Sequence, residues 1–68
     1  MLTVGEKLLK EIHSTALPKL FNIENGTASE HEIFIYKECQ GFIDLIRYSV
    51  MPVNEIKRLW DSSLLAYK

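Results

Sequence analysis

The stretch Ser29 to Val50, SEHEIFIYKECQGFIDLIRYSV, decides the fold because it holds the longest continuous apolar pattern in the chain. Ser29 and Glu32 have the spacing of a capping box, which marks the start of a helix. At about 100° per residue, nine apolar side chains fall within one arc of about 200°, and Tyr48 lies just outside it. They are Phe34, Ile35, Tyr36, Cys39, Phe42, Ile43, Leu45, Ile46 and Val50. A helix that packs on a single neighbour needs an apolar stripe of only about 100° or slightly more. We therefore predict a central helix over residues 30–49 that packs against two or three neighbours.

A strand is the alternative for part of this stretch. The segment His31 to Lys37, HEIFIYK, is rich in β-branched and aromatic residues, which strands favour. One short strand would leave its backbone groups unpaired, however, and the helical pattern continues to Val50. The helix is the preferred interpretation.

A first helix is predicted over residues 4–16. Thr3 and Glu6 form a second capping box, and apolar residues follow at helical spacing. Pro18 disfavours the helical conformation of the residue before it and has no N–H to donate, so the helix is expected to end or kink there. We expect residues 18–21 to form a short helical turn over the end of the core. Residues 22–29, NIENGTAS, then read as a loop with a tight turn.

A third helix is predicted over about residues 53–67. Pro52 is well placed to be the first residue of this helix, where its missing N–H costs nothing. Ile56 and Trp60 belong to its apolar stripe, whereas Leu65 falls on its polar side. The chain therefore reads as a single all-α domain over residues 1–68, a small three-helix bundle with the long helix in the centre.

Composition points to association. The chain has 68 residues, of which 47% are hydrophobic. A chain of this size buries only about 60% of the surface that it exposes when unfolded. Because so small an interior cannot hold this much apolar material, we expect a homodimer or higher homo-oligomer that also binds a protein partner.

Charge and cysteine content limit the class of protein. The chain has eight basic and nine acidic residues, for a formal net charge of −1. A nucleic-acid or anionic-membrane binder usually carries a basic excess. A single cysteine, Cys39, excludes an intrachain disulfide and fits a reducing compartment. The N-terminal segment lacks the pattern of a secretory signal, and no apolar run approaches the ~18 residues that span a bilayer. We expect a cytoplasmic protein with no membrane partner, of a composition that suits a small bacterial or phage protein.

The sequence offers no constellation for catalysis, and no cofactor or metal ligand set is predicted. His13 and His31 are far apart, and Cys39 has no CxxC partner and is expected to be buried. Glu30 and Glu32 lie at a helix start, where the helix dipole favours negative charge. Glu38 falls near the edge of the apolar arc and is expected to reach solvent at its rim.

The leading hypothesis is a non-enzymatic protein-interaction module, acting as a regulator, inhibitor or adaptor. Gly41 lies in the middle of the central helix, where glycine costs about 1 kcal/mol relative to alanine, and a close helix approach or a partner contact would explain it. The predicted interface consists of Phe34, Gly41, Leu45 and Tyr48 on the central helix and the exposed Leu65 on the third.

Two alternatives stay open. Residues 48–65 could form the turn and second helix of a dimeric helix-turn-helix regulator, with Asn54, Lys57 and Arg58 facing nucleic acid. The chain could also bind a small ligand in a pocket at an oligomer interface.

Overall fold

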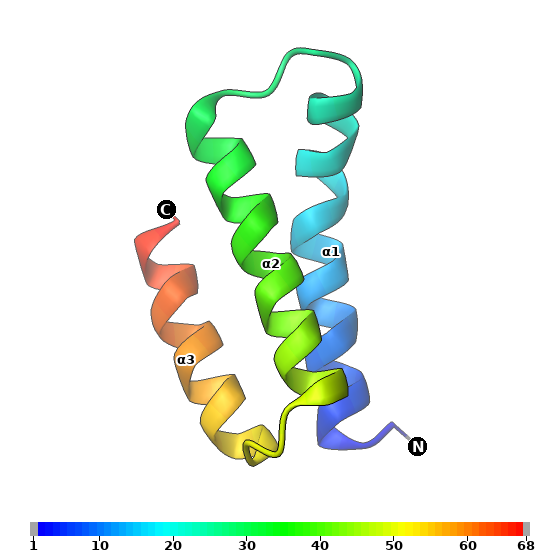
Figure 1. Ribbon diagram of the computed structural model, residues 1–68, viewed down its shortest axis with the longest axis vertical. Coiled ribbons are helices and arrows are strands. Elements are labelled where there is room, and N and C mark those ends of the chain that lie inside the picture. The colour runs from blue at the N-terminus through cyan, green and yellow to red at the C-terminus, as the bar shows by residue number, and fades with distance from the viewer. Residues whose placement is uncertain (1, 68) are drawn as a thin grey trace.

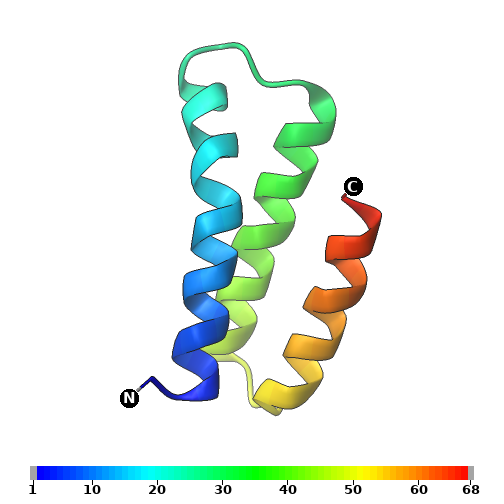
Figure 2. The same ribbon diagram turned by 180° about the vertical axis from the view of Figure 1, so that it is seen from behind.

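The computed structural model describes residues 2–67, which form helices α1 (Val4–Glu24), α2 (Glu30–Tyr48) and α3 (Val53–Ala66) (Figure 1). α1 and α2 form an antiparallel hairpin, and α3 returns alongside α2 and also contacts α1 (Figures 1 and 2). No strand occurs within residues 2–67. The all-helical prediction is confirmed, and residues 31–37 are helical.

Both predicted capping boxes are present. Thr3 Oγ1 accepts the Glu6 N–H at 3.1 Å, and Ser29 Oγ accepts the Glu32 N–H at 3.2 Å. Each glutamate in turn accepts the N–H of its cap residue at 3.4 Å. These bonds satisfy donors that a helix start leaves without intrahelical partners.

The predicted C-terminal ends of the second and third helices each shift by one residue. α2 ends at Tyr48 with Ser49 as its C-cap, and α3 ends at Ala66 with Tyr67 as its C-cap. Pro52 is the N-cap of α3 rather than its first residue.

The predicted end of the first helix is wrong. α1 continues through Pro18 to Glu24, so the connecting loop is confined to residues 25–29. Pro18 cannot donate to the Ser14 carbonyl, and proline inside a helix costs about 3 kcal/mol. Ser14 itself is an exposed residue, and water can satisfy a carbonyl that lacks a helical partner at a solvated position. The missing hydrogen bond lowers the stability of α1 but does not end the helix at Pro18.

Contacts beyond Pro18 hold the last turns of α1 in place. Asn22 Nδ2 donates to Glu32 Oε2 of α2 at 2.6 Å. The Thr27 N–H donates to the Asn22 carbonyl at 2.9 Å, and Gly26 takes a φ of 73°, which reverses the chain. The expected short turn over the core is also wrong, because Phe21 lies on the outside of α1 and is 68% exposed.

The core is a single column of side chains along the three helices. Its eight buried members are Leu8, Ile12, Ala16, Ile35, Cys39, Ile43, Ile56 and Trp60. Trp60 packs edge-on against Phe42, with ring centroids 5.3 Å apart, and against Tyr67 at 6.2 Å. The Trp60 indole N–H is buried without a hydrogen-bond partner among the described residues. The apolar contacts of this ring thus outweigh an unpaired donor, which costs about 1–3 kcal/mol.

The third helix covers only part of the hairpin. α3 has 14 residues, against 21 in α1 and 19 in α2. Its C-terminal end lies beside the middle of α2, so the end of the hairpin that carries the loop extends beyond it (Figures 1 and 2). No residue of α1 after Ala16, and none of α2 before Ile35, is fully buried.

Replacement of Pro18 by alanine tests the account of α1. Pro18→Ala restores a donor for the Ser14 carbonyl but also loosens the unfolded chain. We expect the free energy of unfolding to rise by about 2 kcal/mol, measured by urea denaturation followed by circular dichroism. Pro52→Ala, at a helix cap, is the control and should change it by less than about 1 kcal/mol. A loss of stability in Pro18→Ala would contradict the account.

The buried Cys39 thiol should make the stability of the fold depend on pH in the alkaline range. Burial, with a smaller effect from the nearby Glu38 carboxylate, raises the pKa of Cys39 to about 11. The folded chain therefore holds this proton more tightly than the unfolded chain, whose cysteine titrates near 8.5. Below about pH 8.5, ionisation of Cys39 should not change the free energy of unfolding. Between about pH 8.5 and about pH 11 it should lower the free energy of unfolding, because only the unfolded chain loses this proton. The Cys39→Ala variant should be less stable than the parent chain at neutral pH, but its free energy of unfolding, measured by urea titration, should fall less steeply across this pH range. An equally steep fall in the variant would show that Cys39 does not cause the pH dependence.

Candidate functional site

Four predicted interface residues lie on one stripe of α2, which we call the α2 flank: Phe34, Gly41, Leu45 and Tyr48. Phe34 is 54% exposed and Tyr48 is 79% exposed, whereas Leu45 is half-buried against the core. Phe34 and Tyr48 are separated by 14 residues, about 21 Å along a helix. The α2 flank is therefore an elongated surface with an aromatic side chain near each end.

A shallow hollow of about 250 Å³ lies on the α2 flank, lined by Glu38, Gly41, Phe42 and Leu45. A Cβ atom added at Gly41 would meet nothing within 4 Å. A close approach of another helix within the same chain therefore does not account for this glycine. The missing side chain instead leaves the hollow open.

Glu38, expected near a solvated rim, also takes part in a contact between α2 and α3. Its side chain is half-buried, and Tyr67 Oη donates to Glu38 Oε1 at 2.7 Å. Burial and this hydrogen bond raise the pKa of Tyr67 well above its ordinary value. The bond ties the C-terminal end of α3 to α2 beside the hollow.

Leu65, the remaining predicted interface residue, does not join the α2 flank. It is 74% exposed, as the sequence predicted. It lies five residues from the buried Trp60, about 140° around the helix, and so points away from the bundle.

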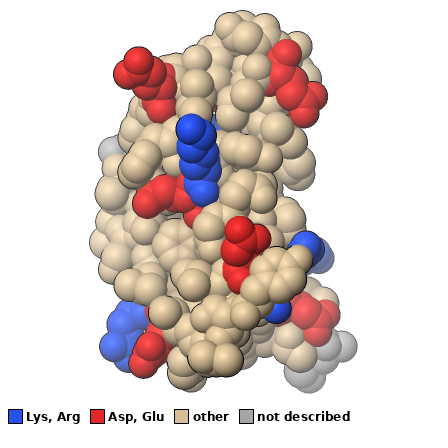
Figure 3. Space-filling view, in the orientation of Figure 1, with Lys and Arg blue, Asp and Glu red and all other residues tan. Residues whose placement is uncertain are grey.

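The predicted nucleic-acid contacts Asn54, Lys57 and Arg58 are all exposed on α3. Lys57 Nζ, however, lies 3.0 Å from Asp61 Oδ2 on the same helix. α2 and α3 run side by side (Figures 1 and 2), whereas the helices of a helix-turn-helix cross at about 90–120°. Charged side chains of both signs are scattered over the face seen in Figure 3, without a basic cluster there. The arrangement of α2 and α3 therefore does not match that of a helix-turn-helix.

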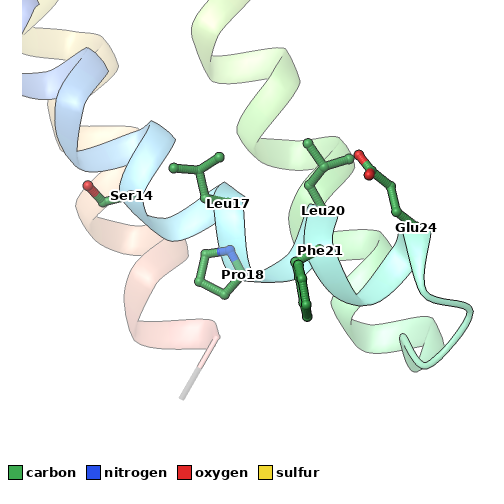
Figure 4. Close-up of a pocket in the computed structure, with 6 residues that line it drawn as sticks. All are labelled: Ser14, Leu17, Pro18, Leu20, Phe21 and Glu24. Atoms are coloured by element: carbon green, nitrogen blue, oxygen red, sulfur yellow. The ribbon is translucent and has the colours of Figure 1, made fainter.

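A second apolar surface, which the sequence analysis missed, lies on the outer side of α1. This α1 groove has a volume of about 650 Å³ and is lined by Ser14, Leu17, Pro18, Leu20, Phe21 and Glu24 (Figure 4). Leu17 is 61% exposed and Phe21 is 68% exposed. The four-residue spacing of Leu17 and Phe21 is typical of one face of a helix, but a helix that ends at Pro18, as the sequence predicts, does not contain Phe21.

Residues 2–67 contain no group of three or more His, Cys, Asp or Glu side chains that could hold a metal ion. The raised pKa of the buried Cys39 thiol disfavours the thiolate, which is the reactive form. None of the described helices combines the length and apolar character needed to cross a bilayer.

Comparison with protein-family models, with curated proteins and with solved structures gives no match for this chain.

Gly41→Ala tests whether the hollow on α2 is open in the free protein. Alanine should raise the free energy of unfolding by about 0.5–1 kcal/mol, because a helix favours it over glycine and the new methyl group meets no neighbour. The control is Gly26→Ala, which should destabilise because the φ of 73° there strains any residue with a Cβ atom. Both are measured by urea denaturation, and destabilisation by Gly41→Ala would mean that the position is occupied.

Proposed function

We propose that this protein is an interaction module, a regulator, inhibitor or adaptor rather than an enzyme, that self-associates and binds a second protein. The observation that carries the proposal is the distribution of its large apolar side chains. Among the described residues, nine large hydrophobic side chains are exposed, whereas the core contains eight buried residues that include the small Ala16 and Cys39.

Exposed apolar residues are informative when they group together. Leu17 and Phe21 lie one helical turn apart in the α1 groove. Phe34 and Tyr48 lie near the two ends of the α2 flank, with the half-buried Leu45 and the hollow between them. Each group is bordered by charged residues, Glu24 at the α1 groove and Glu38 at the hollow of the α2 flank. An apolar centre with a polar rim is the usual anatomy of a protein interface.

Cys39 and Tyr67, two side chains of types that serve as nucleophiles in enzymes, are not activated here. Burial raises the pKa of both Cys39 and Tyr67, which keeps these groups protonated at neutral pH. Protonated thiol and phenol groups are weak nucleophiles.

The proposal is tested by molecular mass and by capture of partners. Light scattering coupled to size exclusion, at tens of micromolar protein, should give a mean mass clearly above that of the 7.9 kDa chain, and the mass should rise with protein concentration. In a pull-down, a double variant Phe34→Ser with Tyr48→Ser should lose a protein that the parent chain retains, because it removes the two exposed aromatic side chains of the α2 flank.

The matched control for the pull-down is Lys37→Ser with Arg47→Ser, which changes two exposed polar positions of the same helix. It should retain the captured protein. A strictly monomeric chain would contradict self-association, and identical capture by all three proteins would contradict a role for the α2 flank.

A further inference from the structure

We propose that the α1 groove binds a second copy of this chain, through a twofold contact in which two α1 helices pack antiparallel. This inference rests on the proposed self-association and assigns it to one surface and one orientation.

The contact follows a stripe along α1, which we call the α1 seam. Its members are Lys7, Lys10, Ser14, Leu17, Phe21 and Glu24, and every one of them is exposed. Their spacings of three and four residues alternate, which is the pattern of the contact line between paired helices. Phe21 lies nine residues after the buried Ile12, about two and a half turns, so the seam faces away from the core.

Charge along the α1 seam is polarised. Its N-terminal end carries Lys7 and Lys10, its centre is apolar apart from Ser14, and its C-terminal end carries Glu24. A parallel pair would set lysine against lysine and glutamate against glutamate. An antiparallel pair with its twofold axis between Ser14 and Leu17 sets Lys7 against Glu24 of the second copy, twice. The α1 seam is therefore complementary to itself in one orientation, as a twofold interface requires.

The centre of the α1 seam supplies the apolar contact. Leu17 and Phe21 line the α1 groove, which is large enough to receive a side chain from another helix (Figure 4). In the antiparallel alignment Lys10 lies opposite Phe21 of the second copy, where its aliphatic stem can cover the ring and its ammonium can reach the ring face. Ser14, opposite Leu17, is small enough to let the two helices approach.

The position of the α1 seam also leaves the rest of the molecule free. α1 turns its opposite side to α2 and α3. Pairing through α1 therefore covers neither Phe34 nor Tyr48 of the α2 flank, and a second protein could bind there at the same time.

The first test compares matched double variants by sedimentation equilibrium from about 5 to 500 µM, a range suited to a contact along one helix. Leu17→Ser with Phe21→Ser should raise the dissociation constant of the dimer at least about 100-fold, because both apolar side chains at the centre of the contact are lost. The control, Phe34→Ser with Tyr48→Ser, should leave it within about twofold of the parent value. Circular dichroism should show unchanged helix content in both, since all four side chains are largely exposed.

A charge-reversal cycle tests the orientation and keeps the inference falsifiable if the serine variants lose stability. At low salt, Lys7→Glu alone and Glu24→Lys alone should each raise the dissociation constant by about three- to tenfold, since two exposed pairs per dimer become repulsive. The two changes together should restore it to within about twofold. Additive weakening in the combined variant would exclude the antiparallel alignment.

The outcomes separate the two proposals. If the parent chain stays monomeric over the whole range, both the self-association and this inference are overturned. If it forms a dimer that the Leu17 and Phe21 changes do not weaken, self-association stands and the α1 seam is excluded. If Phe34→Ser with Tyr48→Ser weakens the dimer instead, the contact between the two copies lies on α2 and the inference is overturned.

Discussion

The packing of Ile56 and Trp60 against the α1–α2 hairpin is the interaction on which the rest of the structure depends. Both side chains are 0% exposed, as are Ile12 of α1 and Cys39 of α2. Without α3, the hairpin would leave one side of this column open to water. Full burial of one such side chain stabilises a fold by about 1.5–3 kcal/mol, a large share of what a chain of this size has available. The Glu38–Tyr67 hydrogen bond and the aromatic contacts of Trp60 then fix where α3 ends along α2.

The same arrangement determines which apolar residues stay outside. α3 is shorter than its neighbours and lies along only part of the hairpin. Three helices around a single column of side chains enclose one face of each helix, so a helix that is apolar on two faces must expose one of them. α2 exposes the face with Phe34 and Tyr48, and α1 exposes the face with Leu17 and Phe21. The α1 groove and the α2 flank thus follow from the high hydrophobic content of a chain that folds into so small a bundle.

Local signals in the sequence predicted the fold well, and tertiary contacts explain where prediction failed. The capping boxes at Thr3 and Ser29 act over three residues, so sequence alone located both helix starts. Pro18 is also a local signal, but its penalty of about 3 kcal/mol is opposed by contacts such as Asn22 with Glu32, which only the folded chain brings together. That failure hid the α1 groove. The α2 flank lies within one uninterrupted helix, and periodicity was sufficient to find it.

Pro18 connects the stability of the chain with its proposed contact. A proline in this position destabilises the isolated helix, yet its ring adds apolar surface to the α1 groove between Leu17 and Phe21. Charges along the α1 seam select an orientation but add little affinity, because exposed pairs contribute at most about 1 kcal/mol each. The affinity of an α1 pair must therefore come from the apolar centre, where the proline lies. If the chain associates as proposed, part of the stability that Pro18 removes from the single chain is recovered when α1 of a second copy covers the groove around the proline.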